Sequence, residues 1–449
     1  MGTLNQKLGT QSVKKSFFQY FLPTIFGMML MSVNIVIDGI FVGHGIGSVA
    51  LASVNIAAPV FSIIISVALL IGIGGATLYS MSIGEKEPEK AKQYFSLAIL
   101  LTAIISVVIT VIGYFNVEAI ARFFGANDET LGYAIDYMSV LFIGSMIVAF
   151  ETVLSIFVRN DGAPNLAMTG LIVSAVINIL LNYWMIFILE WEVIGTALAT
   201  TIATALGALV YILHFFNKNS GLKFIRPRKV WKQVKTISAI GFPNFLSEAG
   251  IGIFVIGYNV AMAYYIGTSG LAAFSVINYL HTFMFLAFIG IGTTIQPMIS
   301  YYYGAKRYDS ITDTVKLAEK TGLVLGIIFT LIGFFGADLL VAIFGVESKE
   351  IFEMATSGLK LFFLGYLFMG INFIYMTYYQ SIGRVKPSII ITVARGFIIL
   401  IVMLLILPYF FGINGIWLAL PVTEAIVAVI LVLFVRKGVI EQRRMVLPR

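Results

Sequence analysis

Two long stretches without a charged residue constrain this chain most. Residues 39 to 84 and residues 249 to 305 contain no Asp, Glu, Lys or Arg. A helix needs about 20 apolar residues to cross the roughly 30 Å hydrocarbon core of a bilayer, so each stretch can cross it twice. Only 11% of the 449 residues are charged, whereas soluble domains contain about 25%. We therefore predict an integral membrane protein without a large soluble domain.

Apolar runs of spanning length recur along the whole chain. They predict twelve transmembrane helices, over residues 16–39, 50–79, 94–115, 134–158, 166–189, 194–217, 238–266, 271–303, 317–340, 355–381, 388–411 and 414–435. Within the two uncharged stretches, only the Gly-rich turns near residues 43–48 and 267–270 separate one helix from the next. The expected fold is all-α and integral to the membrane.

The basic residues predict the orientation. With the N-terminus in the cytoplasm, every Lys and Arg falls in a cytoplasmic segment except Arg122, Lys349, Lys360 and Arg395. Short cytoplasmic loops of membrane proteins carry such an excess. Both termini should therefore be cytoplasmic, and the net charge of +7 indicates contact with anionic membrane lipids. We do not expect nucleic-acid binding.

An internal repeat predicts the architecture. A shift of about 220 residues superimposes several short matches, which we take to mark two copies of a six-helix unit. The matches are Leu22-Pro23 with Phe242-Pro243, Ile71 to Gly74 with Ile289 to Gly292, Phe124-Gly125 with Phe344-Gly345, and Gly195 with Gly415. Because six is even, both copies enter from the same side and form parallel repeats. We predict an N-lobe over 1–217, a cytoplasmic basic linker over 218–236 and a C-lobe over 237–449.

Composition narrows the function. The chain has no Cys and only three scattered His, so it offers no thiol nucleophile and no evident metal cluster. No phosphate-binding loop and no acid–base constellation appear. We therefore predict neither an enzyme nor a cofactor. Two lobes around a central cavity suit alternating access, which favours a transporter over a scaffolding membrane protein. Uphill transport would then require an ion gradient.

Polar residues inside the predicted N-lobe helices are the first site candidates. Asp38 lies toward the outer end of the first helix. It is either an interfacial carboxylate or a proton or cation site, because buried charge is costly in lipid. Asn178 and Asn182 share a helix face at i and i+4. They either offer oxygens to an ion or join helices by hydrogen bonds.

The predicted C-lobe holds further candidates. Glu248, Glu424 and Arg395 fall near mid-membrane at a rise of 1.5 Å per residue. Arg395 and Glu424 are either a structural ion pair or part of a site. Glu248 has no evident partner and is a candidate second protonation or substrate-cation site. Glu151 is a weaker candidate of the same kind, and His281 is expected to be a neutral core residue.

Several motifs, in order along the chain, resemble the multidrug and toxic compound extrusion (MATE) family. The resemblance covers about residues 16 to 437 and is greatest to its bacterial DinF/MepA-like branch. The motifs are Val-Ile-Asp38-Gly-Ile-Phe-Val-Gly, Arg159-Asn-Asp-Gly-Ala-Pro164, Gln296-Pro297 with Tyr303-Gly304-Ala-Lys306, and Gln380-Ser-Ile-Gly383 with Lys386-Pro387. The resemblance implies an antiporter that exports amphipathic organic cations and drugs in exchange for H⁺ or Na⁺.

The resemblance also implies an ion site in the N-lobe. Family members place a first-helix Asp, a fifth-helix Asn with an acid one turn later, and a sixth-helix Thr around it. These map to Asp38, Asn178, Asn182 and Thr200. Because Asn182 replaces the acid, H⁺ is favoured as the coupling ion, with Na⁺ at Asp38 and Asn178 as the alternative.

In the C-lobe, Glu248 matches a family acid, and Asn372 is the nearest polar residue to a second acid that is absent here. Glu424 stands where relatives of this branch often have Asp. A flippase for a lipid-linked or polysaccharide precursor is the alternative function, although its cavity should carry several basic residues. We expect a monomer, spanning the bacterial inner membrane several times.

Overall fold

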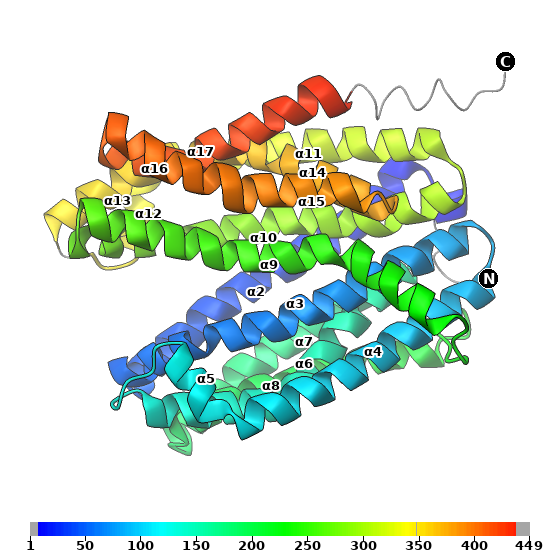
Figure 1. Cartoon of the computed structure of the whole chain (residues 1–449), viewed down its shortest axis with the longest axis horizontal. Helices are drawn as coiled ribbons and strands as arrows, with labels where there is room; N and C mark the ends of the chain where they lie inside the picture. Colours follow the sequence, from blue (N-terminus) through cyan, green and yellow to red (C-terminus); the bar gives the residue numbers. More distant parts are fainter. Residues whose placement is uncertain (1–7, 347, 437–449) are drawn as a thin grey trace. The chain divides into compact units, whose positions relative to one another are not determined.

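The computed structural model describes residues 8–346 and 348–436, and these residues form helices joined by short connections without a β-strand. The chain divides into two compact units, the first ending at Phe245 and the second beginning at Leu246. Figure 1 shows the helices of each unit in sequence colours. The terminal segments, which carry several of the basic residues in the orientation prediction, lie outside the described residues.

The first unit contains long helices packed side by side. They are α2 (Val13–Gly45), α3 (Ser48–Gly84), α4 (Pro88–Phe115), the short α5 (Val117–Phe123), α6 (Leu131–Asn160), α7 (Pro164–Tyr183), α8 (Glu192–Ile212) and the first part of α9 (Val230–Tyr265). Within this unit α3 packs on α6, and α7 packs on both α2 and α8. A π-helical turn, Trp184–Ile188, follows α7.

The second unit repeats this plan. It contains the rest of α9, then α10 (Thr268–Gly304), α11 (Tyr308–Phe335), the short α12 (Ala337–Ala342), α13 (Lys349–Phe362), α14 (Tyr366–Ser381), α15 (Val385–Val393), α16 (Ile399–Phe411) and α17 (Ile413–Ile430). The turn Phe363–Gly365 makes α13 and α14 one span, and the π-helical turn Ala394–Ile398 joins α15 to α16.

The prediction of twelve membrane-spanning helices is confirmed. Among the described residues, twelve helices are long and apolar enough to cross a bilayer. Their ends differ from the prediction, because helices continue past the apolar core into charged segments. Thus α9 already begins at Val230 and carries Lys232 and Lys235. The predicted end of the ninth span at residue 340 was wrong, since α11 ends at Phe335 and α12 follows Gly336.

Glycines in the left-handed region make the internal repeat visible in the backbone. Gly47 and Gly267 have φ of 124° and 89° and separate the first two spans of each unit. Gly125 and Gly345 have φ of 101° and 64° and follow the short helices α5 and α12. Such values strain residues with a side chain, so glycine at both copies of each turn reflects one shared backbone path.

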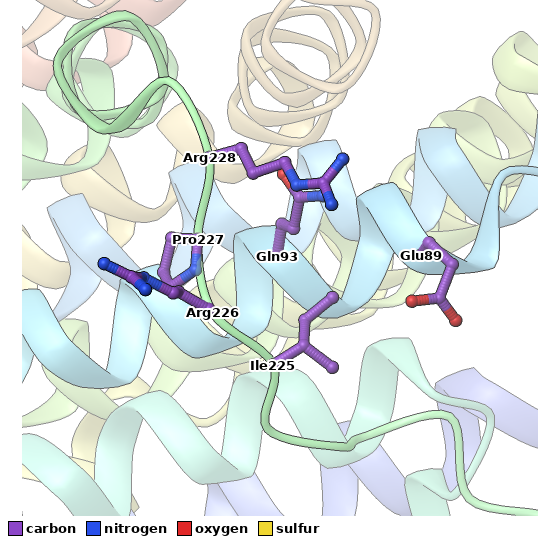
Figure 2. A pocket seen from close by; sticks show the side chains of 6 residues that line it. All are labelled: Glu89, Gln93, Ile225, Arg226, Pro227 and Arg228. Carbon is purple, nitrogen blue, oxygen red and sulfur yellow. The ribbon is translucent and has the colours of Figure 1, made fainter.

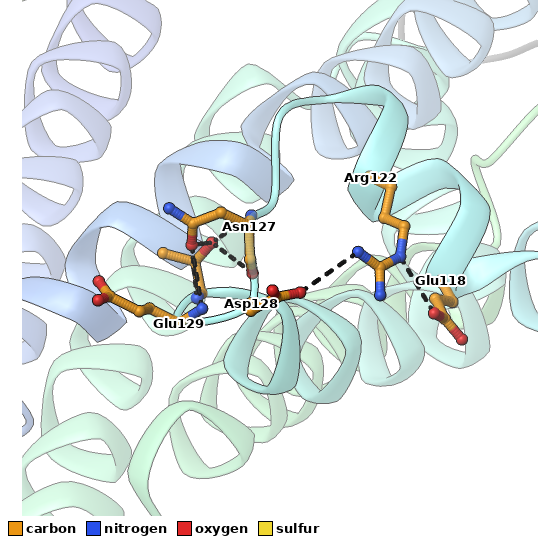
Figure 3. A network of polar contacts seen from close by, with 6 residues as sticks. Glu118, Arg122, Asn127, Asp128 and Glu129 are labelled. Carbon is orange, nitrogen blue, oxygen red and sulfur yellow. Dashed lines mark hydrogen bonds and ion pairs between the residues drawn. The ribbon is translucent and has the colours of Figure 1, made fainter.

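The connection between α5 and α6 is closed by polar contacts (Figure 3). Asn127 Oδ1 accepts hydrogen bonds from the backbone N–H of Glu129 and of Thr130, at 3.2 and 3.0 Å. The Arg122 guanidinium lies 3.1 Å from Glu118 and 3.7 Å from Asp128. The charge of Arg122, one of the basic residues predicted to lie outside the cytoplasm, is therefore balanced locally.

Candidate functional site

Three helices of the first unit bring the predicted N-lobe residues together. Asp38 comes from α2, Asn178 and Asn182 from α7, and Thr200 from α8. Asn182 Nδ2 donates to Asp38 Oδ1 at 2.6 Å and lies 3.2 Å from Asn178 Oδ1. Asn178 Nδ2 donates to Thr200 Oγ1 at 3.2 Å. The i, i+4 spacing of the two Asn residues puts both amides on the face that meets α2.

Asn34 is a member of this cluster that sequence reasoning missed. Its Nδ2 donates to Asn178 Oδ1 at 2.8 Å, from one helical turn before Asp38 on α2. The spacing of Asn34 and Asp38 on one helix face was the signal that could have identified it. We call Asn34, Asp38, Asn178, Asn182 and Thr200 the Asp38 cluster.

The Asp38 cluster contains one carboxylate and no cation. Within the described part of the chain, Asn182 is the only hydrogen-bond donor to Asp38, and no Lys, Arg or His pairs with it. Asn178 and Asn182 are almost fully buried, and the buried Asn182 Oδ1 has no hydrogen-bond partner there. One neutral amide, that of Asn182, thus contacts the half-buried Asp38 carboxylate, and Asn34 and Thr200 bond to Asn178 behind it.

The same residues are a poor match to a dedicated metal site. No group of three or more His, Cys, Asp or Glu is gathered anywhere in residues 8–346 and 348–436. A hard cation prefers several oxygen ligands that include negative ones. Asn178 Oδ1 already accepts hydrogen bonds from Asn34 and Asn182. Asp38 is therefore the one negatively charged oxygen ligand that the cluster offers.

An apolar cluster lies one helical turn beyond Asp38 on α2. Val42 is buried with Ala50, Ile186 and Val193, and Tyr137 is among the partly buried rings around them. Ile186 belongs to the π-helical turn that begins two residues after Asn182. π-helical turns are rare and occur frequently at functional sites.

The second unit holds a different polar cluster, formed by Glu424 of α17, Arg395 of the turn Ala394–Ile398 and Asn372 of α14. Arg395 Nη2 and Nε lie 2.6 and 3.1 Å from Glu424 Oε1. Asn372 Nδ2 donates to Glu424 Oε2 at 2.5 Å and to the Glu424 carbonyl at 3.0 Å. The Arg395 guanidinium also covers the Phe373 ring at 4.2 Å from its centroid. We call Asn372, Arg395 and Glu424 the Glu424 cluster.

Glu248 does not join the Glu424 cluster. It lies half-buried on α9, and no hydrogen bond or ion pair with another described residue reaches its carboxylate. One turn earlier on the same helix, the buried Asn244 Oδ1 also lacks a hydrogen-bond partner among the described residues. The structure therefore leaves an unpaired carboxylate in the second unit.

The other two intramembrane candidates have ordinary partners. His281 Nδ1 lies 2.9 Å from the Tyr366 hydroxyl, and the His281 ring packs against Phe254. Glu151 accepts a hydrogen bond from the Tyr211 hydroxyl at 3.2 Å, and this hydroxyl also lies 3.1 Å from the Ala167 carbonyl. Neither residue contacts the Asp38 or Glu424 cluster in these bonds.

The motif Arg159 to Pro164 acts in packing. Asp161 is fully buried, and its carboxylate lies 2.6 Å from the Tyr79 hydroxyl and 2.7 Å from His214 Nε2. The same carboxylate accepts a hydrogen bond from the backbone N–H of Gly221 at 2.9 Å. Asp161 therefore ties α3, the end of α8 and the start of the linker together, which sequence spacing did not reveal.

The fold and the Asp38 cluster define a multi-pass membrane protein whose first unit carries an intramembrane carboxylate, Asp38, that pairs with no basic residue of the described chain. The MatE family model matches residues 23–184 and 251–406, which include Asp38, Asn178, Asn182, Asn372 and Arg395. The chain belongs to the MatE family, the multidrug and toxic compound extrusion family that its motifs resemble. The family consists of transporters and not enzymes, as predicted.

Relatives and solved structures agree with this assignment. The chain is 28% identical to the multidrug export protein MepA of Staphylococcus saprophyticus over 94% of both chains. It is 28% identical to MepA of Staphylococcus aureus strain MSSA476, covering 94% of this chain and 93% of that protein. A crystal structure of MATE in complex with MaL6 matches with a TM-score of 0.93 at 22% identity, covering 99% of this chain and 100% of that chain.

A second solved structure shows the same fold. An outward-facing multidrug resistance MATE family transporter matches with a TM-score of 0.92 at 23% identity, over 98% of both chains. The predicted all-α fold of twelve membrane-spanning helices is thus confirmed.

Proposed function

We propose that this chain is a secondary active antiporter that exports amphipathic organic cations and drugs in exchange for H⁺ by alternating access. The observation that carries the proposal is the Asp38 carboxylate, which is bonded to the neutral Asn182 amide and to no cation in the described residues. An uncompensated charge is costly in hydrocarbon, and binding one proton removes that cost. Asp38 can therefore alternate between two states of similar energy as its access to water changes.

Substrate charge is the second element of the proposal. The MepA relatives are named for multidrug export, and we extend that activity to this chain. Glu248 is an intramembrane carboxylate of the second unit that pairs with no other described residue, and it would attract a cationic substrate. Flexible Met and aromatic side chains, of which the chain has 17 Met, 37 Phe and 21 Tyr, adapt to many shapes and attract cations through ring faces.

The pairing of Arg395 argues against the flippase alternative. An anionic headgroup would need free basic side chains inside the membrane. Arg395 is bonded to Glu424 at 2.6 Å, so its charge is already balanced. We further propose a bacterial cytoplasmic membrane location with both termini inside.

Transport into liposomes tests the proposal. With Na⁺ absent, purified protein should move a cationic dye in response to an imposed pH gradient. Asp38→Asn should reduce this movement by about 100-fold or more, in the range expected when a proton-transfer group is removed, while dye binding persists. Asp136→Asn is the matched control, because it makes the same chemical change at an exposed position on α6, and it should transport like the parent.

Two results would contradict the proposal. Dye movement that follows an imposed Na⁺ gradient and ignores the pH gradient would exclude H⁺ as the coupling ion. Full gradient-driven movement by Asp38→Asn would remove Asp38 from the mechanism.

A further inference from the structure

A basic strap runs from Asn217 to Lys229 and is fixed to the first unit. The Gly221 backbone N–H donates to Asp161 at 2.9 Å, and the Ile225 N–H donates to Ser96 Oγ at 2.9 Å. Leu222 is only 2% exposed. The strap therefore follows a defined path across the N-terminal end of α4. A flexible charged linker that only joined two helices would not need these contacts.

A cavity of about 590 Å³ lies between this strap and the first turns of α4. Figure 2 shows its lining residues, which are Glu89, Gln93, Ile225, Arg226, Pro227 and Arg228. The Gln233 side chain donates to Gln93 at 3.2 Å and ties the start of α9 to the same wall. This volume falls within the range of about 300 to 1,000 Å³ that is typical of small-molecule sites.

The charges around the cavity do not cancel. Neither Arg226 nor Arg228 forms an ion pair with any residue the structure describes. The one acid in the wall, Glu89, lies 2.5 Å from Lys92 and is already paired. Its neighbour Lys90 pairs with other acids outside the cavity. The two exposed guanidinium groups, which extend from the strap in opposite directions in Figure 2, thus give the wall of the cavity a net positive charge.

The cavity lies where two membrane spans end. α4 begins at Pro88 and α9 at Val230, and both are long enough to cross the bilayer. Phe224 and Trp231 flank the cavity in sequence and are 63% and 80% exposed. Exposed aromatic side chains beside basic residues are typical of the level of lipid headgroups.

We propose that this cavity binds the phosphate group of an anionic molecule. Guanidinium groups bind phosphate through paired, charge-assisted hydrogen bonds, and basic pockets between membrane-spanning helices bind phospholipid headgroups. The exposed aromatic residues favour a phospholipid of the adjacent leaflet over a soluble phosphate ester. The site is separate from the Asp38 cluster and does not depend on the proposed transport activity.

Native mass spectrometry of the full-length protein in detergent tests the proposal. Phosphatidylglycerol should bind about 10-fold or more tightly than phosphatidylcholine. Arg226→Gln/Arg228→Gln should remove most of that difference, because it removes the basic groups that attract an anionic headgroup. Lys223→Gln/Lys232→Gln is the matched control. It removes the same charge from exposed positions on the strap and α9 that do not line the cavity, and should change binding less than about twofold. An equal loss in both double variants would overturn the proposal, because it would indicate a general basic surface.

Two further variants test the cavity itself. Gln93→Trp fills the space without changing charge and should weaken phosphatidylglycerol binding, whereas Glu89→Gln removes the one acid in the wall and should strengthen it. If both variants bound like the parent, the cavity would not be the site. Soluble glycerol phosphate distinguishes the sources of the phosphate group. Weak competition by it supports a lipid headgroup, and competition at equal concentration supports a soluble phosphate ester.

Discussion

The Asp38 and Glu424 clusters place carboxylates in very different surroundings within the two units. Glu424 is 1% exposed and lies 2.6 Å from Arg395, so its negative charge is balanced in every state that keeps the pair. Asp38 is half-buried and receives one hydrogen bond from the neutral Asn182. The first arrangement suits a fixed structural role, and the second suits a group that gains and loses a proton.

Both clusters lie beside a π-helical turn. Asn182 precedes the turn Trp184–Ile188, and Arg395 lies within the turn Ala394–Ile398. A π-helical turn leaves the regular hydrogen-bond ladder and re-aims nearby side chains. The two units therefore share a π-helical turn beside their polar clusters. The clusters differ in that Glu424 pairs with a cation and Asp38 does not, which we expect to decide whether the carboxylate can gain and lose a proton.

The largest effect is expected from giving Asp38 the partner that Glu424 has. Asn182→Lys places an ammonium group at the position whose amide now lies 2.6 Å from Asp38. A permanent ion pair would hold Asp38 ionised, so pH-driven dye transport should fall by about 100-fold or more. Liposome transport under a pH gradient measures this loss.

The control for this variant is Asn182→Met, which removes the hydrogen bond without adding charge. Its pH-driven transport should fall by only about 10-fold, because one hydrogen bond to a charged group contributes about 1.5–3 kcal/mol. If Asn182→Lys transported as well as Asn182→Met, the absence of a cation would not be what distinguishes Asp38.

The sequence predicted the spans better than the contacts. Stretches without charge locate helices in a bilayer, because charge inside hydrocarbon is costly whatever the tertiary packing. Helix ends were misplaced where the helix leaves the bilayer, as at Val230. There the polar composition resembles that of a loop, so the apolar criterion stops too early.

Contacts between helices could be predicted only where a family motif or the spacing of residues along one helix indicated them. The meeting of Asp38 with Asn178 and Asn182 was expected from the family resemblance, and Asn34 could have been added from its i, i+4 spacing. The bond from Asn372 to Glu424 joins residues 52 apart on different helices. Its formation depends on how α14 packs against α17, which no local pattern in the sequence records.

The second-largest effect is expected on folding stability, when one partner of the Arg395–Glu424 ion pair is removed. Glu424→Gln or Arg395→Met leaves one buried charge without its partner, which should cost about 3–5 kcal/mol of folding stability. The double variant Arg395→Met/Glu424→Met removes both charges and should recover most of the loss. Thermal unfolding in detergent measures the three variants against the parent.

Transport under a pH gradient tests whether the Arg395–Glu424 ion pair also takes part in proton coupling. The double variant should keep pH-driven transport within a few-fold of the parent, because Asp38 is unchanged. A double variant that is stable but does not respond to the pH gradient would show that Glu424 or Arg395 takes part in coupling. The assignment of a purely structural role to the Glu424 cluster would then be wrong.

The smallest effect is expected at Glu248, the carboxylate that has no partner although it shares a unit with Glu424. Asp38 accepts a hydrogen bond from Asn182, whereas no hydrogen bond or ion pair with a described residue reaches Glu248. We therefore expect Glu248 to attract cationic substrates and Asp38 to carry the proton coupling. Glu248→Gln should weaken transport of a monovalent cationic dye by about 5-fold and of a divalent dye by more. The reason is that attraction between two opposite charges in partly hydrated surroundings contributes on the order of 1 kcal/mol.

A neutral amphipathic substrate separates attraction from coupling at Glu248. Its transport should be the same in Glu248→Gln and the parent, and both should respond equally to the pH gradient. The exposed control Glu353→Gln on α13 should leave all three substrates unaffected. Equal losses for neutral, monovalent and divalent substrates in Glu248→Gln would assign Glu248 to coupling, and Glu248 would then share the role that we propose for Asp38.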